Sequence, residues 1–277
     1  MNGAITDDDL NYPVINLICF KNHGKDFTPE DVAATWLGYV PFGAVCTAER
    51  VAYKNLCNMT EPPASASFRN PYREWIGAQI RADFWGWVSP GKPEQAAGYA
   101  WRDACISHVK NGIYGEMWAA AMMAAAFSLS DMKEIIKAGL KTVPPKSRLH
   151  RAVSRMLDLY DSGISFEQAA EDIASRWNEN HGHHWCHTIS NAEIVTAALL
   201  WGEKDFSKTV FYSVFPGFDT DCNGATAGSV LGIVLGGKAI PESWTGPVND
   251  TLETALAGYN NVKVSEMAAL TEELSRK

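Results

Sequence analysis

The sequence lacks the features of several large protein classes. It has no basic stripe, and its formal net charge of −8 argues against nucleic acid as a partner. It has no signal-peptide-like start, and its longest apolar run, from Trp118 to Phe127, is too short to span a bilayer. Its six cysteines form neither a CxxC pair nor a dense disulfide framework. These absences predict a cytoplasmic protein with reduced thiols and no membrane partner.

Strand signals are also scarce, whereas helix signals recur along the chain. Alternating Val, Ile and Thr runs bounded by hairpin turns are almost absent. Thr28-Pro29-Glu30-Asp31 is typical of a helix start, and Ser165-Phe166-Glu167-Gln168 is a capping box. There is no internal repeat and no obvious linker. The sequence therefore predicts one all-α domain over residues 1–277, a bundle of roughly ten helices. Residues 54–71 are predicted as a loop, a candidate cover for a site.

Acidic motifs lie near both ends of the chain. Asp219 and Asp221 lie two residues apart, and residues with this spacing point the same way in an extended or turn segment. Thr6-Asp7-Asp8-Asp9 lies at the other end. Carboxylates that converge from both ends favour a site for hard divalent metal ions. The alternatives are that the late pair only caps the following helix, and that Thr6 caps a helix starting at Asp7.

The two acidic motifs, taken together, resemble those of the ADP-ribosylglycohydrolase family, which includes dinitrogenase reductase-activating glycohydrolase and the jellyfish J1 crystallins. The resemblance covers nearly the whole chain. Less specific segments also look like family elements: Gly77-Ala78-Gln79-Ile80-Arg81, Ser107-His108, Ile189 to Asn191, and Ile240-Pro241-x-x-Trp244.

The resemblance implies an all-α bundle with a centre of two Mg²⁺ ions, Mn²⁺ being the alternative. It implies metal ligands at Thr6, Asp7, Asp8, Asp219 and Asp221, the four aspartates also being the catalytic residues. The family often has Thr or Ser where this chain has Cys222, a soft thiol that is a poor Mg²⁺ ligand. Asn223 is the predicted replacement ligand, through its amide oxygen, with a water molecule as the alternative.

The implied activity is Mg²⁺-dependent hydrolysis of the glycosidic bond at the ribose of an ADP-ribosyl conjugate. The alternatives are hydrolysis of another ribosyl or glycosyl compound, and a non-catalytic ADP-ribose-binding or structural homologue. Family members carry a Gly-rich helix and an acidic residue before the Thr-Asp-Asp motif, but this chain starts almost at the motif. We therefore expect an N-terminal segment to be missing, and with it the acid/base Glu.

Four residues in the first half of the chain are candidates for contact with substrate. Backbone N–H groups near Gly77, with Arg81 as a charge partner, are predicted to approach a diphosphate. The alternative for Arg81 is an ion pair with a nearby acid. His108 matches the family's histidine and is either a substrate contact or a structural residue, and Asn111 lies close by. Glu116 is expected either to face the cleft or to interact with a helix N-terminus.

The histidine-rich segment 181–187 supplies the remaining candidates. Trp185 and His187 are predicted to line the cleft, with Trp185 stacking on an adenine. A polar surface loop with a buried Trp is the alternative. His183 and His187 are four apart, but no Glu follows His183 and Gly182 indicates a loop, so zinc is the weaker interpretation.

Overall fold

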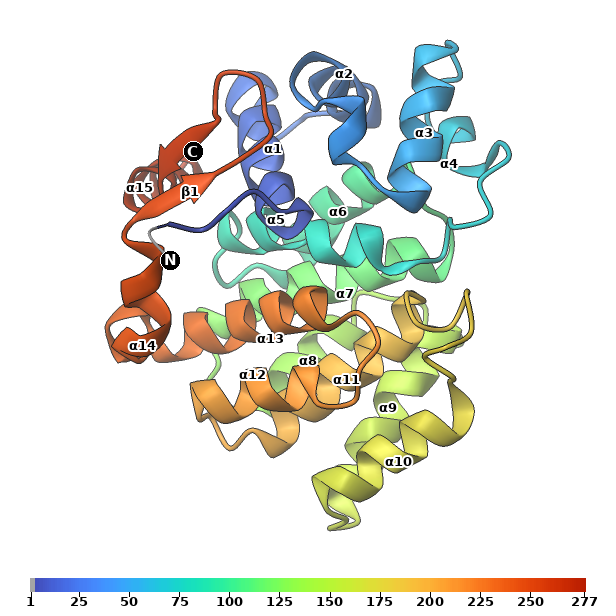
Figure 1. Cartoon of the computed structure of the whole chain (residues 1–277), viewed down its shortest axis with the longest axis vertical. Coiled ribbons are helices and arrows are strands. Elements are labelled where there is room, and N and C mark those ends of the chain that lie inside the picture. The colour runs from blue at the N-terminus through green and yellow to red at the C-terminus, as the bar shows by residue number, and fades with distance from the viewer. Residues whose placement is uncertain (1–2) are drawn as a thin grey trace.

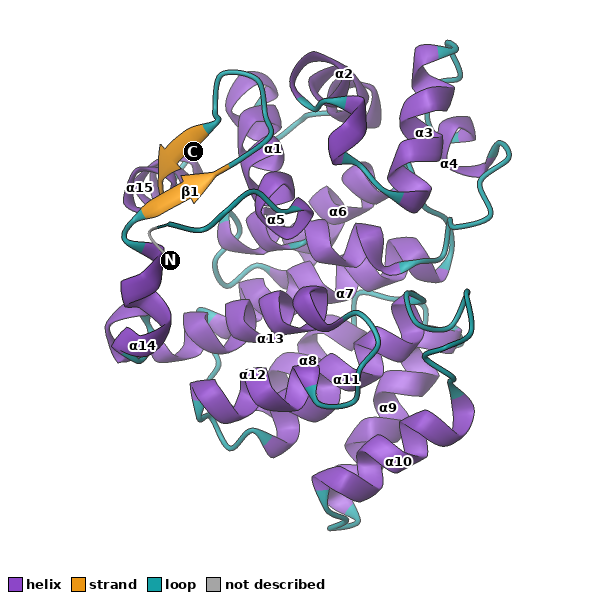
Figure 2. Ribbon diagram, viewed as in Figure 1, coloured by secondary structure: helices purple, strands orange, loops and turns teal. Residues whose placement is uncertain are grey.

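The computed structural model describes residues 3–277, so the expectation about the start at Met1 lies outside the described residues. Figures 1 and 2 show a molecule built almost entirely of helices. The α-helices are α1 (Asp8–His23), α2 (Pro29–Tyr39), α3 (Thr47–Cys57), α4 (Ala64–Ser67), α5 (Asp83–Trp87), α6 (Pro93–Ala104), α7 (Asn111–Ala126), α8 (Met132–Leu140), α9 (Arg148–Asp161), α10 (Phe166–Arg176), α11 (Thr188–Trp201), α12 (Phe206–Val214), α13 (Thr220–Leu235), α14 (Glu242–Thr245) and α15 (Val264–Ser275). Four 3₁₀ turns and one hairpin complete the fold: η1 (Phe42–Ala44), η2 (Ile76–Arg81), η3 (Gly237–Ala239), η4 (Gly246–Val248), β1 (Thr251–Glu253) and β2 (Asn261–Lys263). The all-α prediction is confirmed.

Helix α7 is the centre of the bundle. It contacts helices α5, α6, α8, α9, α11 and α13 as well as η2. Its side chains are apolar on nearly every face, and Trp118, Met122 and Met123 are fully buried. A helix that is apolar all round must be covered on all sides, because any face left in water would lose the free energy of burial.

Local capping residues fix several helix starts. Ser165 forms the predicted capping box at the start of α10, and Thr28, predicted as a helix start, also forms a capping box at the start of α2. Ser147 caps α9 by accepting a hydrogen bond from the backbone N–H of His150. Asp131 caps α8 by accepting a hydrogen bond from the backbone N–H of Glu134. These side chains satisfy backbone donors that the first helical turn leaves without partners.

The described residues contain fifteen α-helices rather than roughly ten. Part of the excess is α4, α5 and α14, which are four or five residues long and too short to show a helical period. The prediction of a loop over residues 54–71 was also wrong in part, since α3 runs to Cys57 and α4 lies within the segment. Asn55 ties the two helices together by donating to the carbonyls of Ser65 and Phe68.

The start of the described chain pairs with its C-terminal part. Ala4 forms a parallel bridge with Leu252 of β1, and its backbone donates to Thr251 and accepts from Glu253 at 2.9 Å each. In Figure 1 the dark-blue segment accordingly runs beside β1 on its way to α1. Because α1 also contacts α13, both acidic motifs are brought to one region of the molecule. None of the helices within residues 3–277 has the length and apolarity that a membrane crossing requires.

Candidate metal centre

The early acidic motif forms the N-terminus of α1. Asp7 is the N-cap residue, and its Oδ1 accepts a hydrogen bond of 2.9 Å from the backbone N–H of Asp9. The alternative role for Thr6, as cap of a helix starting at Asp7, was therefore wrong: the helix starts at Asp8, one residue later. Thr6 is exposed beside the cap. The helix N-terminus adds a partial positive charge where the acidic residues lie.

The late acidic motif lies at the N-terminus of α13. Asp219 is in the N-cap position, but its side chain makes no capping hydrogen bond. Its Oδ2 instead accepts from the thiol of Cys186 at 3.3 Å. Asp219 is nearly buried and Asp221 is exposed. A side chain that caps a helix accepts a hydrogen bond from a backbone N–H of the first turn. Asp219 does not, which argues against the alternative that it serves only as a cap.

The two motifs meet in space. Carboxylate oxygens of Asp7, Asp8 and Asp9 lie within 4.8 Å of one another. Ligand atoms of Asp9, Asp221 and Cys222 form a second group within the same distance, so Asp9 belongs to both groups. The sequence analysis did not select Asp9 as a site residue, although it is the third of three consecutive aspartates. We call Asp7, Asp8, Asp9, Asp219 and Asp221 the aspartate cluster.

Burial and mutual repulsion raise the proton affinity of this cluster. Burial, followed by the charge of Asp7, raises the pKa of Asp8 to about 6. Burial, followed by Asp8 and Asp7, raises the pKa of Asp9 well above its ordinary value. Burial is also the main cause that raises the pKa of Asp219 to about 6. Within residues 3–277, no Lys, Arg or His forms an ion pair with a member of the aspartate cluster. The negative charge therefore has no side-chain counter-charge there.

Asn191 in α11 joins the late motif to the histidine-rich loop. Its Oδ1 accepts from the backbone N–H of Asp219 at 3.2 Å and from Nδ2 of Asn223 at 2.8 Å. Its Nδ2 donates to the carbonyls of Trp185 and His187 at 3.0 Å each. Asn223 is fully buried, and its Oδ1 has no hydrogen-bond partner among residues 3–277. Asn191 thus holds the carboxamide of Asn223 in place relative to the backbone of Asp219.

The predicted cleft residues of the 181–187 loop lie in different settings. Trp185 is 37% exposed and packs edge-on against Trp75, with ring centroids 5.8 Å apart. His187 is the N-cap of α11, and its Nδ1 accepts from the backbone N–H of Ile189 at 3.1 Å. Its ring lies against Trp177, and burial lowers its pKa to about 4. His187 is therefore a neutral helix cap, whereas Trp185 has an exposed ring.

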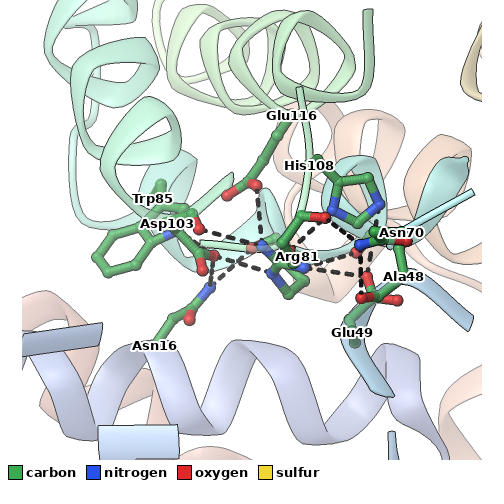
Figure 3. Close-up of polar contacts among 11 residues, drawn as sticks. Asn16, Ala48, Glu49, Asn70, Arg81, Trp85, Asp103, His108 and Glu116 are labelled. Atoms are coloured by element: carbon green, nitrogen blue, oxygen red, sulfur yellow. Dashed lines mark hydrogen bonds and ion pairs between the residues drawn. The ribbon is translucent and has the colours of Figure 1, made fainter. Parts of the chain in front are cut away.

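Arg81 lies in the interior, contrary to the predicted diphosphate contact. It is 0% exposed, and its guanidinium pairs with Glu49 at 3.0 Å, Asp103 at 3.2 Å and Glu116 at 3.6 Å. Figure 3 shows Arg81 between Asp103 on one side and Glu49 on the other. A Cβ atom on Gly77 would lie 1.9 Å from Oε1 of Glu49, so the glycine makes room for that carboxylate. Neither Gly77 nor Arg81 is placed to meet a diphosphate.

His108 and Asn111 also have interior partners. Nδ1 of His108 lies 2.8 Å from the Ser107 hydroxyl, and burial followed by Arg81 lowers the pKa of His108 well below its ordinary value. Asn111 donates to Glu74 at 2.7 Å and accepts from the backbone N–H of Leu149 at 3.1 Å. Both side chains are buried and therefore hold the interior together instead of facing a substrate. Glu116 likewise faces Arg81 rather than a cleft. We call Arg81, Glu49, Asp103, Glu116 and His108 the Arg81 cluster.

Comparisons with known proteins identify the family. The sequence model for ADP-ribosylglycohydrolase matches residues 2–275. Among solved structures, a chain described as "ADP-ribosylglycohydrolase-related protein complex" superposes with a TM-score of 0.65 at 17% sequence identity, over 98% of this chain and 81% of that one. That likeness supports the fold. The search of curated proteins finds no match. Because the family model spans almost all of the sequence, the chain belongs to the ADP-ribosylglycohydrolase family.

Proposed function

We propose that the protein is a Mg²⁺-dependent hydrolase that cleaves the glycosidic bond at the ribose of an ADP-ribosyl conjugate. Its membership of a glycohydrolase family supports the reaction class. The observation that carries the proposal is the aspartate cluster, in which acidic side chains from both ends of the chain converge with no ion-paired basic side chain among residues 3–277.

The donor atoms of the cluster suit a hard cation. Asp7, Asp8 and Asp9 offer carboxylate oxygens within 4.8 Å of one another, and Mg²⁺ prefers oxygen ligands. Oδ1 of Asp9 is buried without a hydrogen-bond partner among residues 3–277, a costly state that a cation would relieve. Mg²⁺ held by these residues would bind the ribose hydroxyls and polarise a water molecule. Thr6 and Asn223 remain proposed ligands beside the aspartates.

The side chains of the chain itself have three tasks in this reaction. The aspartates hold the reacting groups in place and provide negative potential where positive charge develops on the ribose in an oxocarbenium-like transition state. One carboxylate of the cluster accepts a proton from the attacking water. As the water oxygen bonds to the anomeric carbon, the bond to the leaving group breaks, and the proton is returned to that group.

Trp185 is the residue that we propose binds the adenine. Its ring is partly exposed, and the backbone carbonyl of Trp185 is tied through Asn191 to the segment that carries Asp219. A rigidly mounted aromatic ring can stack on a base at little cost in side-chain entropy. The hydrogen bonds of Asn191 thus couple the proposed base-binding surface to the proposed reaction centre.

The test is hydrolysis of a panel of ADP-ribosyl conjugates, on arginine, on serine and on small molecules, with Mg²⁺ and with EDTA. We expect release of ADP-ribose that needs Mg²⁺ and falls by roughly 10²–10³-fold in Asp221→Asn. Asp205→Asn is the matched control, because Asp205 is an exposed helix cap outside the aspartate cluster. Unchanged turnover in Asp221→Asn would contradict the mechanism. ADP-ribose binding without turnover of any conjugate would instead select a non-catalytic binder.

A further inference from the structure

The aspartate cluster contains a sulfur atom as well as oxygens. Ligand atoms of Asp9, Asp221 and Cys222 all lie within 4.8 Å of one another, close enough to contact one ion. The neighbouring group of Asp7, Asp8 and Asp9 offers oxygen only. The group that contains sulfur should therefore prefer a different kind of metal ion from the group that contains oxygen alone.

A second observation indicates that an ion belongs beside Asp9, which is a member of both ligand groups. Oδ1 of Asp9 is shut off from solvent and has no hydrogen-bond donor among residues 3–277. A buried carboxylate oxygen without a donor costs free energy, and a cation supplies the missing partner. Cys222 is itself 5% exposed, so its sulfur faces protein atoms and this group of ligands rather than bulk water.

We propose that Asp9, Asp221 and Cys222 form a mixed thiolate–carboxylate site that takes a borderline divalent transition-metal ion of the Zn²⁺ class in preference to Mg²⁺. Thiolate is a soft ligand that suits Zn²⁺ and Fe²⁺, whereas Mg²⁺ demands oxygen ligands in octahedral geometry. As the sulfur–metal bond forms, the thiol proton is released to the solvent buffer. The inference rests on the metal-binding part of the proposed function and does not depend on the substrate.

A second buried cysteine provides a matched comparison. Cys186 donates its thiol hydrogen to Oδ2 of Asp219 at 3.3 Å, yet its sulfur is not in the ligand group of Asp9 and Asp221. Both thiols are nearly inaccessible, and both lie beside Asp219. Cys186→Ser and Cys222→Ser are therefore equally conservative changes, and only the second removes a proposed ligand. Cys57, which is exposed, is the remote control.

The first experiment uses Co²⁺ as a spectroscopic probe on the full chain after treatment with EDTA. Sulfur bound to Co²⁺ gives a charge-transfer absorption in the near ultraviolet that oxygen ligands do not give. We expect this band in the wild type, in Cys186→Ser and in Cys57→Ser, and its loss in Cys222→Ser. A wild type that binds Co²⁺ without the band overturns the inference, and so does a band that survives in Cys222→Ser.

The second experiment measures Zn²⁺ and Mg²⁺ affinities by titration calorimetry, which needs no substrate. Cys222→Ser should weaken Zn²⁺ binding by at least roughly tenfold while leaving Mg²⁺ affinity within about threefold, since only the softer ion depends on sulfur. Equal losses for the two ions would overturn the metal preference. Mg²⁺ binding without a sulfur-dependent Zn²⁺ site leaves the proposed function standing, whereas a wild type that binds neither ion removes the basis of both proposals.

Discussion

The Arg81 cluster and the aspartate cluster are built from the same kinds of acidic side chain and differ in what balances their charge. In the first, three carboxylates surround a guanidinium that is fully buried. In the second, aspartates from the two ends of the chain converge, and no basic side chain within residues 3–277 pairs with any member of the cluster. The Arg81 cluster is closed off from solvent, whereas the aspartate cluster includes the exposed Asp221.

The difference shows how one chain can use carboxylates for two purposes. Around Arg81 the counter-charge is covalently part of the protein, and bonds from Trp85 and Asn16 to Asp103 complete the network in Figure 3. Burial and the neighbouring Asp103 also raise the pKa of Glu116 well above its ordinary value. Such a network holds the interior in one arrangement. In the aspartate cluster the counter-charge must come from outside the protein, as a binding site for a cation requires.

Removing the guanidinium should have the largest effect on stability. Arg81→Met leaves buried carboxylates without their cation, and we expect a loss of about 3–5 kcal/mol in the free energy of unfolding, measured by urea denaturation. The control is Arg155→Met, which breaks a surface pair with Asp172 and should cost no more than about 1 kcal/mol. Equal losses in the two variants would mean that the Arg81 cluster contributes no more than a surface ion pair.

Adding a cation should stabilise the aspartate cluster. At a Mg²⁺ concentration of 100 times Kd, binding should add about 2.7 kcal/mol, seen as a rise in Tm that EDTA reverses. Asp8→Asn should lose most of this rise, and it should also melt higher than the wild type in EDTA, because one of the mutually repelling carboxylates is gone. An Asp8→Asn variant that retains the full Mg²⁺-dependent rise would speak against a metal site there.

The charge balance around Arg81 should also be visible in the pH dependence of stability. Burial raises the pKa of Glu49 from 4.5 to about 7 despite the guanidinium of Arg81. A carboxyl whose pKa is raised on folding stabilises the native state fully below its unfolded pKa, so this contribution is lost as the pH rises from about 4.5 through about 7. Glu49→Gln should flatten that part of the pH profile of urea denaturation, whereas the exposed Glu134→Gln should leave it unchanged.

We expect the smallest effect from Trp185, the aromatic residue of the proposed substrate site. Trp185→Ala should raise KM for an ADP-ribosyl substrate roughly fivefold and leave kcat nearly unchanged, since the loss of one stacking ring costs about 1 kcal/mol of binding. Trp244→Ala is the control, because Trp244 of α14 is similarly exposed and donates a hydrogen bond to Ser207 of α12. Equal effects of both variants on KM would remove Trp185 from the substrate site.

The sequence by itself determined the elements that depend on short-range order. Capping residues such as Thr28 and Ser165 mark helix starts because they bond backbone groups three positions away. The apolar composition of α7 predicts a central helix for the same local reason. The two acidic motifs could be recognised as a pair from the sequence, and the structure brings them together.

Only the tertiary structure decided which polar residues face inward. Arg81 meets Asp103 and Glu49 across 22 and 32 positions of sequence, and no periodicity connects such partners. Its predicted contact with a diphosphate was wrong because an arginine four residues after a glycine looks the same in sequence whether it is exposed or buried. Asp9 and Cys222 likewise become neighbours only when α1 packs against α13. Helix caps are set by nearby residues, whereas ion pairs and metal sites depend on how distant helices pack, and that is a property of the whole fold.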